Sequence, residues 1–362
     1  GDSSAITIGL GTPAVPTQVS GGGLGTVSLA GVEDVSVDAS DGDVTVEGTA
    51  NDDEISVTPT GSDAADIEVG DLNIAFSLDG INGLTIDPEG ATGDADEVRV
   101  LGDAGVNDID VDRSVSTVQV DALQVVTVTA GNTEMLVIDA GLNDDTVTVS
   151  GTGGPALTVL GSGPAASDTL EIEGDNDGSD AFTYLPGDSD GSGEVVLDGD
   201  GTAFEGIEAL TLDGGGGDGM DTLTASGTGD GEAFTLDTTA GANAADLWIG
   251  SYAPISLTGF GTDDSTITLN GLGGDDSFSV THANDWDFAT VDIDGGAPSA
   301  SDSFDLIGTG SDDVIVWTPT DDNAGTLEVT SGLVSNTYEL TDIESAEVDG
   351  GGGADSLSAT TE

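Results

Sequence analysis

Apolar and polar residues alternate along most of this chain in short runs. Examples are Val44-Thr-Val46, Ile55-Ser-Val57 and Leu210-Thr-Leu212. A period of two residues is typical of strands with one buried and one exposed face. No segment keeps a helical period over a useful length, because glycine interrupts almost every window. The pattern therefore predicts an all-β protein.

The predicted strands are short, and their spacing is regular. They recur roughly every 10 to 12 residues and are bounded by Gly, Asp, Asn or Pro, which are typical turn residues. Such a chain folds either as a repetitive β-solenoid, a β-helix-like stack, or as tandem small β-sandwich domains. The Gly-Asp turns and the short strands favour the β-solenoid, in which each repeat buries its apolar face against its neighbours.

The chain also repeats itself on a longer scale. Residues 48–60 and 308–320 match closely, and residues 174–186 are a looser copy. Three more sets have the same spacing: 32–38 with 207–213 and 343–349, 163–170 with 297–304, and 141–149 with 271–280. The spacings indicate a period of about 130 residues, made of two related halves of about 65.

These repeats suggest a division of the chain. We expect an N-terminal extension at 1–30, β-repeat unit 1 at 31–165, β-repeat unit 2 at 166–299 and a partial β-repeat unit 3 at 300–362. The chain starts and stops out of phase with its own repeat. One hypothesis is that residues 1 to about 20 act as an exchanged strand that completes the next copy head to tail. The alternative is that the chain is a piece of a longer repeat array.

The charge is extreme and restricts the partners. There are 71 acidic residues against two arginines, Arg99 and Arg113, and the formal net charge is -69. Such a charge opposes a compact state unless cations, salt or a basic partner neutralise it. Nucleic acid is excluded as a partner because phosphate binding needs Lys and Arg. Membrane insertion is excluded because no apolar run approaches about 18 residues.

Two loops carry a recognisable metal-binding pattern. Residues 216–224 and 350–358 both read Gly-Gly-x-Gly-x-Asp-x-hydrophobic-x, with weaker relatives at 271–279 and 140–148. At these residues the chain resembles the RTX, or haemolysin-type, calcium-binding repeats of secreted bacterial proteins. The resemblance implies Ca²⁺ as cofactor and an extracellular location. Calcium prefers six to eight oxygen ligands, and glycine lets a loop turn its carbonyls toward one point.

The RTX repeats run in tandem, whereas each nonapeptide here stands alone. We therefore expect ligands from loops about ten residues apart, such as Asp302 with Asp312 and Asp313, Asp168 with Asp180, and Asp221 with Asp230. The predicted metal ligands are Asp52, Asp53, Asp144, Asp145, Asp168, Asp180, Asp218, Asp221, Asp230, Asp275, Asp276, Asp302, Asp312, Asp313 and Asp355. The alternative is that Gly-Asp clusters are ordinary turns.

A recurrent glutamate precedes a predicted strand at Glu33, Glu208 and Glu344. It is either a further carboxylate ligand or a hydrogen-bonded turn cap, and the sequence favours neither.

The chain has little material for catalysis. It contains one histidine, His282, and no cysteine or lysine. A lone histidine near Trp286 is more typical of packing than of a general base. We expect no enzyme and no catalytic residue; a polysaccharide-active enzyme is the remote alternative.

Repetition without a singular site favours scaffolding. The sequence predicts an extracellular structural protein, a filament, sheath or surface-layer subunit that self-associates and is stabilised by calcium. The alternative is a calcium-dependent adhesin or stalk with a cell-surface glycan as partner. A high-salt habitat is the competing explanation of the acidity.

Overall fold

The structure is a computed structural model. It describes residues 5–12, 15–23, 25–72, 74–90, 95–163, 167–176, 178–216, 219–260, 265–283, 286, 288–297, 301–332 and 334–360. The chain forms two compact units. The first contains Gly1–Leu170 with Thr202–Gly206, and the second contains Glu171–Gly201 with Ile207–Glu362.

The described residues form strands and one short 3₁₀ helix, η1 (Gly70–Leu72), and no helix among them could cross a membrane. The strands that lie within the first unit are β1 (Ile6–Gly9), β2 (Thr17–Gly21), β3 (Val27–Leu29), β4 (Asp34–Glu47), β5 (Glu54–Gly61), β6 (Ala64–Val69), β7 (Ile74–Asp87), β8 (Glu97–Leu101), β9 (Asp108–Asp112), β10 (Thr117–Val120), β11 (Val126–Val128), β12 (Met135–Asp139), β13 (Thr146–Ser150) and β14 (Ala156–Leu160). The division crosses β15 (Thr169–Glu173) and β18 (Asp200–Glu205).

The strands that lie within the second unit are β16 (Ala181–Pro186), β17 (Gly193–Leu197), β19 (Ala209–Asp213), β20 (Thr222–Ser226), β21 (Ala233–Gly241), β22 (Ala244–Ile249), β23 (Ile255–Thr258), β24 (Thr266–Asn270), β25 (Ser277–Thr281), β26 (Thr290–Asp294), β27 (Ser303–Ile307), β28 (Asp313–Asp321), β29 (Ala324–Ser331), β30 (Val334–Thr341), β31 (Ser345–Asp349) and β32 (Ser356–Ala359).

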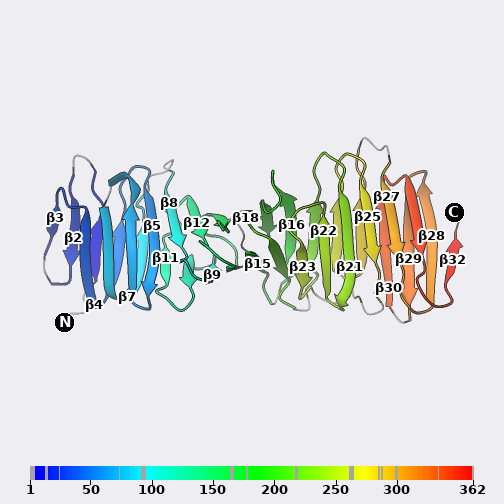
Figure 1. Cartoon of the computed structure of the whole chain (residues 1–362), viewed down its shortest axis with the longest axis horizontal. Coiled ribbons are helices and arrows are strands. Elements are labelled where there is room, and N and C mark those ends of the chain that lie inside the picture. The colour runs from blue at the N-terminus through cyan, green and yellow to red at the C-terminus, as the bar shows by residue number, and fades with distance from the viewer. Residues whose placement is uncertain are drawn as a thin grey trace. The chain divides into compact units, whose positions relative to one another are not determined.

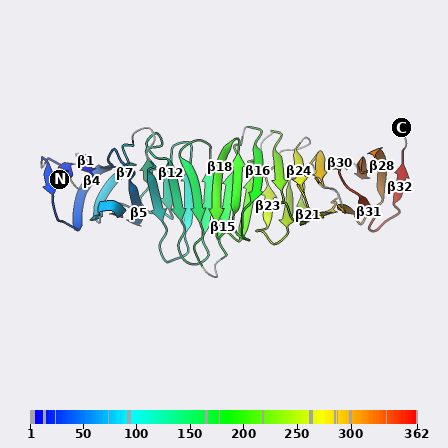
Figure 2. The ribbon, with the colours of Figure 1, turned by 90° about the horizontal axis from the view of Figure 1, so that it is seen from above.

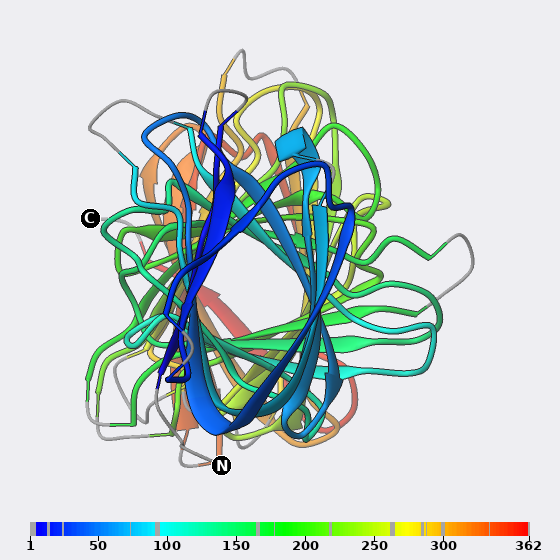
Figure 3. The same ribbon diagram turned by 90° about the vertical axis from the view of Figure 1, so that its left-hand side faces the viewer.

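In the first unit, strands stack in parallel columns, one strand from each successive coil. Strands β1, β4, β7 and β11 form one column, and β5, β8, β12, β14 and β18 form another (Figure 1). A third column contains β9 and β13. In the end-on view of Figure 3, the blue and cyan strands of this unit lie on facing walls. This repetitive stack is an all-β solenoid, as the sequence predicts.

The second unit is built in the same way. Strands β16, β20, β24, β26 and β30 form one column, β21, β25, β27 and β31 form another, and β28 pairs with β32 (Figure 2). Strand β25 pairs with β27, so a column continues across the predicted boundary at residues 299 and 300.

The alternation of apolar and polar residues explains why each column of strands has one buried face. Inward positions of neighbouring strands are in register, so apolar residues stack on one another. In the first unit Ile55 pairs with Val98 and Val98 with Leu136, and all three are almost fully buried. In the second unit the stack is aromatic: Phe278 lies between Phe234 and Phe304, with ring centroids of Phe234 and Phe278 4.7 Å apart. β-Branched and aromatic residues suit such a pleated, buried surface.

New columns begin at antiparallel hairpins. β5 and β6 form one such hairpin, and β16 with β17 and β28 with β29 form others. These three hairpins coincide with the sequence repeats at 48–60, 174–186 and 308–320.

The N-terminal strand pairs with strands of its own chain in this structure of a single chain. Residues 1–4 lie outside the described part, but β1 pairs in parallel with β4 of its own chain and antiparallel with β2. The side chains of Ile6 and Ile8 are buried there, with 8% and 0% exposed. Releasing this strand from its own unit would expose both side chains to water unless another copy covered them.

Candidate functional site: buried carboxyl ladders

The residue just before each column strand is usually a buried polar residue. Its side chain accepts a hydrogen bond from the backbone N–H of the equivalent residue one coil earlier. We call each such series a ladder. The ladders are Asp53–Asp96–Glu134, Asn107–Asp145–Asp168, Asp180–Asp221–Ser265, Glu232–Asp276–Asp302–Glu344 and Asp313–Asp355.

The longest of these ladders shows the geometry. Asp276 Oδ1 accepts from the N–H of Glu232 at 2.7 Å, and Asp302 Oδ1 accepts from the N–H of Asp276 at 2.7 Å. Glu344 Oε2 in turn accepts from the N–H of Asp302 at 2.8 Å. Each side chain thus satisfies a backbone donor at the start of a strand, where no strand partner is available, and ties one coil to the next.

The first residue of a ladder also binds its own loop. Asp53 Oδ2 accepts from the N–H of Thr49 at 2.7 Å, and Asp313 Oδ2 accepts from the N–H of Thr309 at 2.8 Å. Asn107 Oδ1 accepts from the N–H of Asp103 in the same way, at 3.2 Å. These contacts are side-chain caps of tight turns.

Glycines in the preceding loops make room for the ladder side chains. A Cβ added to Gly214 would lie 2.7 Å from Asp221 Oδ2, and one added to Gly350 would lie 2.7 Å from Asp355 Oδ2. Real Cβ atoms essentially never come closer than 3.0 Å to such an atom. In these two loops the carboxyl group leaves no room for a side chain in place of the glycine.

Burial perturbs the acidity of the ladders. It raises the pKa of Asp180 to about 6 and that of Asp276 to about 6. The backbone hydrogen bonds to these two carboxyl groups act in the opposite direction and lower the pKa. Burial also raises the pKa values of Asp145 and Asp302. Nearby carboxylates add to the rise at all four residues, because like charges disfavour ionisation.

Most predicted metal ligands belong to this arrangement. Asp53, Asp145, Asp168, Asp180, Asp221, Asp276, Asp302 and Asp313 are buried ladder residues, and Asp355 is an exposed one. Asp52, Asp144 and Asp312 lie on the exposed side and accept the N–H groups of Ala95, Ser167 and Ala354. Asp230 and Asp275 are exposed, and Asp218 lies outside the described residues.

The structure brings these residues together at other spacings than the sequence suggests. Asp168 meets Asp145, 23 residues away, and Asp221 meets Asp180, 41 residues away. Asp302 meets Asp276 at a separation of 26, and Asp313 meets Asp355 at 42. The separations are coil lengths, because stacking a solenoid places equivalent positions of successive coils side by side.

A calcium ion needs six to eight oxygen ligands. Within the described ranges, no group of three or more His, Cys, Asp or Glu residues could hold a metal ion. At Asp276 one carboxyl oxygen, Oδ1, already accepts the backbone N–H of Glu232. The ladders thus bring no third side chain of this kind to a common point within the described residues.

Several ladder residues were missed by sequence reasoning: Asp96, Asn107, Glu134, Glu232 and Ser265. Their signal is position, since each stands directly before an alternating run. Glu344, left open between ligand and turn cap, accepts the backbone N–H of Asp302 in another coil.

The outer faces carry a second kind of acidic feature, which we call the facing pairs. Glu47 with Asp87, Asp292 with Glu339, and Asp305 with Glu347 lie opposite each other on neighbouring parallel strands. Neighbouring strands are about 4.8 Å apart. Burial raises the pKa of Asp292, as does Glu339; burial also raises that of Glu47, as do Glu89 and Asp87.

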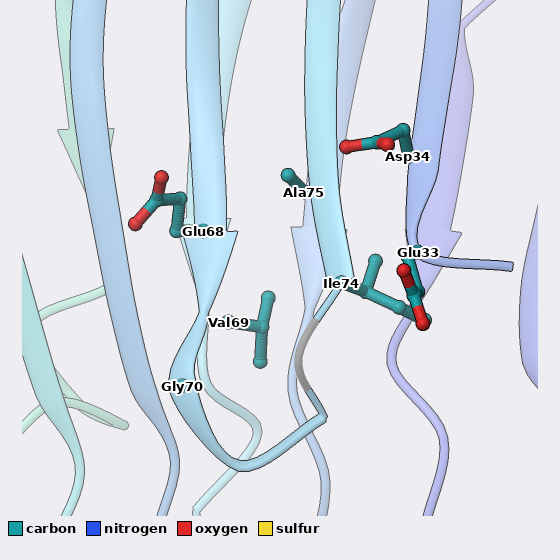
Figure 4. A pocket seen from close by; sticks show the side chains of 7 residues that line it. All are labelled: Glu33, Asp34, Glu68, Val69, Gly70, Ile74 and Ala75. Carbon is teal, nitrogen blue, oxygen red and sulfur yellow. The ribbon is translucent and has the colours of Figure 1, made fainter.

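A pocket of about 310 Å³ in the first unit is also acidic, lined in part by Glu33, Asp34 and Glu68. Figure 4 shows that these carboxylates do not converge, since Glu68 points away from Glu33 and Asp34. The pocket therefore offers no common binding point.

The lone histidine is a core residue. His282 is 2% exposed, and a hydrogen bond of 2.9 Å joins its Nδ1 to the Tyr338 hydroxyl. Burial lowers its pKa.

Comparisons with known proteins found no relative: no family model, no curated protein and no solved structure matches the chain.

Proposed function

We propose that this chain is an extracellular structural solenoid, a subunit of a filament, sheath or surface layer, whose outer carboxylates are neutralised by calcium. The observation that carries the proposal is the set of facing pairs on an otherwise uniform stack. The ladders tie coil to coil, and the columns stack equivalent strands in register. Such a design suits a scaffold, because its stability comes from contacts between neighbouring repeats.

The facing pairs need cations. Carboxylates directly opposite each other on adjacent strands destabilise a sheet. The charged side chains that could offset them are two arginines in the whole sequence, and Arg99 is engaged by Asp139 at 3.1 Å and by Glu97 at 3.5 Å. Two carboxylates and water suit a weakly held calcium ion, of the kind that extracellular proteins bind at about 10⁻⁴–10⁻³ M.

A matched pair of double variants tests the calcium proposal. Asp292→Asn with Glu339→Gln removes one facing pair. Glu194→Gln with Glu328→Gln makes the same charge change at residues that pair with Leu185, Val316 and Thr337. The urea midpoint of each protein is measured at pH 7.5 with chelator and with millimolar calcium.

We expect calcium to raise the midpoint of the wild type and of the control, and to raise that of the facing-pair variant by less. Equal increases of the urea midpoint with calcium in all three proteins would show that calcium does not act at the facing pairs.

We also propose that copies associate through the sheet edges at which the apolar interior is accessible. A pocket of about 470 Å³ in the first unit is lined by Ile6, Val27 and Val35, among others. One of about 240 Å³ in the second unit is lined by Trp317 and Leu357, among others. Leu357 is 63% exposed, and exposed apolar patches of this kind mark interaction sites.

Leu357→Asp is expected to reduce the calcium-dependent assembly measured by light scattering and electron microscopy. Leu272→Asp is the control, because Leu272 is 54% exposed but lies in a loop away from the pocket-lining set. Assembly that survives Leu357→Asp unchanged would contradict this edge as the contact.

A further inference from the structure

One hairpin of the second unit carries an exposed tryptophan on its outer face. Trp248 of β22 is 38% exposed and lies opposite Thr235 of β21, the strand that runs beside β22 (Figure 1). Its neighbours in the strand, Leu247 and Ile249, are almost fully buried. A rigid strand pair thus holds the tryptophan with more than a third of its surface in solvent. Tryptophan is among the residues most enriched at the positions that carry binding energy in protein interfaces.

The hairpin has two counterparts in the same chain, and neither has a tryptophan at this position. Strand β22 reads Ala-Ala-Asp-Leu-Trp-Ile, β6 reads Ala-Ala-Asp-Ile-Glu-Val, and β29 begins Ala-Gly-Thr-Leu-Glu-Val. Each of the three pairs antiparallel with the strand before it. The residue at the position of Trp248 is an exposed glutamate in both counterparts, Glu68 and Glu328. The hairpin therefore forms without an aromatic residue there, and Trp248 needs another explanation.

A second residue also distinguishes this hairpin. Asp237 of β21 lies directly opposite Asp246 of β22. The counterparts have Thr58 and Thr318 at the position of Asp237. Two carboxylates directly opposite each other destabilise a strand pair. Of the three hairpins, the one with the tryptophan is thus also the one with an added, unfavourable carboxylate.

The tryptophan and the two carboxylates border one area of the outer face. Trp248 is two residues from Asp246, so both are on the same face of β22. Residues diagonally across an antiparallel pair, as Trp248 and Asp237 are, lie about 7–8 Å apart, within reach of aromatic and long side chains. Asp246 Oδ1 accepts from the Ser256 hydroxyl at 2.8 Å, and Asp237 Oδ1 accepts from the N–H of Thr239 at 2.9 Å. These hydrogen bonds hold both carboxylates in place.

An aromatic ring beside two carboxylates suits a cation. A cation over the face of a tryptophan is attracted by the ring, and an arginine guanidinium both stacks on aromatic faces and donates to carboxylates. The formal net charge of -69 attracts basic chains and repels acidic ones. We propose that Trp248, Asp237 and Asp246 form a docking site for an arginine of a basic protein segment. The guanidinium stacks on the indole and donates to the carboxylates, which relieves their repulsion.

The arginine comes from a different protein rather than from a second copy of this chain. The whole sequence has two cationic side chains of the Lys or Arg type, Arg99 and Arg113. Arg99 is engaged by Asp139 at 3.1 Å. Arg113 is 7% exposed and donates to the carbonyl oxygen of Gly153 at 2.9 Å. The site therefore goes beyond the proposed self-association, and it depends neither on calcium nor on the sheet edges.

The test uses a short fluorescent peptide with one arginine among glycine and serine residues, and a matched peptide with the neutral citrulline in its place. Binding to the full chain is followed by fluorescence anisotropy, in a buffer with chelator and with sodium chloride just sufficient for the circular dichroism of the folded protein. Trp248→Glu gives the hairpin the residue of its counterparts, Glu68 and Glu328, so the variant is expected to fold. It also adds one negative charge. Val314→Glu is the control, because it makes the same charge change at another apolar side chain, which is 50% exposed.

We expect the wild type and Val314→Glu to bind the arginine peptide more tightly than the citrulline peptide. Trp248→Glu should bind the arginine peptide about 2- to 30-fold more weakly than the wild type, the range for a cation on a tryptophan face. Asp237→Thr, which introduces the residue of Thr58 and Thr318, should weaken binding and its dependence on salt. An affinity of Trp248→Glu equal to or above that of the wild type would overturn the proposal, because charge alone would then attract the peptide. So would equal affinities of the wild type for the two peptides, or no binding of either.

Discussion

The glycine beside a ladder carboxyl group should be intolerant of even one methyl group. Gly214 is the clearest case. A Cβ there would lie 2.7 Å from Asp221 Oδ2, 3.0 Å from its Cγ and 3.1 Å from the carbonyl oxygen of Gly259. The carboxyl group cannot simply turn away, because its Oδ1 accepts the N–H of Asp180 at 3.0 Å. Asp221 is 1% exposed, so there is little space around it.

The magnitude follows from this geometry. Overpacking a well-packed site typically costs about 1–3 kcal/mol. Where a glycine has open space and an ordinary φ, alanine instead stabilises by about 0.4–1 kcal/mol, because it restricts the unfolded chain. Gly229 is such a site, with nothing within 4 Å of an added Cβ. We expect Gly214→Ala to be destabilising by about 1–3 kcal/mol and Gly229→Ala to be neutral or stabilising.

A double-mutant cycle identifies the cause. Asp221→Ser removes Oδ2 but keeps a hydroxyl acceptor, as the natural ladder residue Ser265 does for the N–H of Asp221 at 3.2 Å. In the Asp221→Ser background, Gly214→Ala should cost at least about 1 kcal/mol less than in the wild type, within the usual range of coupling between touching residues. Urea unfolding at constant salt and calcium measures all four proteins. If Gly214→Ala is as well tolerated as Gly229→Ala, the Asp221 carboxyl group does not require a glycine at position 214.

Three further perturbations test other parts of the structure. Phe278→Ala removes a buried ring from the aromatic stack and should cost about 3–5 kcal/mol in urea unfolding; a cost no larger than that of Leu272→Ala, at an exposed site, would contradict the packing described here. Because burial lowers the pKa of His282, its contribution to stability is present above an unfolded-state pKa of about 6.5 and is lost as the pH falls. His282→Gln should therefore lose less stability than the wild type between pH 7 and pH 5, and an unchanged pH profile of stability would refute this. Arg99→Gln breaks a half-exposed ion pair with Asp139 and should cost at most about 1 kcal/mol at low salt and less in molar salt; a salt-independent cost would show that packing dominates there.

Much of the fold could be predicted from local pattern. Runs such as Ile55-Ser-Val57 lie in strands with alternating burial, because a period of two residues allows one face to be buried only in a strand. The period of about 130 residues is visible in the sequence because the strands that open hairpins, β5, β16 and β28, lie in the matching segments at 48–60, 174–186 and 308–320. The number of residues between strands that stack on each other could not be predicted from the local pattern. It alternates between long and short coils: Leu223 pairs with Ile267, and Ile267 pairs with Val291.

The candidate site was harder to predict, for a physical reason. An aspartate that follows a glycine-rich turn has the same local sequence whether it binds calcium or caps the backbone of another coil. Asp276 was predicted as a metal ligand from its loop alone, whereas its hydrogen-bond partners are Glu232 and Asp302, which are 44 and 26 residues away. Only the coil lengths determine these contacts. Asn107 and Ser265 were missed because hydrogen bonding to a backbone N–H needs no carboxylate.

The central claim is that cations, and calcium in particular, hold together a solenoid that its own charge would otherwise disrupt. The most direct measurement is circular dichroism with thermal unfolding of the full chain at pH 7.5 and low salt, with chelator, with millimolar calcium, and with molar sodium chloride and chelator. The account predicts a cooperative β-sheet transition in calcium that moves to a much lower temperature or disappears in chelator at low salt. A chain that unfolds at the same temperature with calcium and with chelator at low salt, or that folds only in molar sodium chloride, would contradict it.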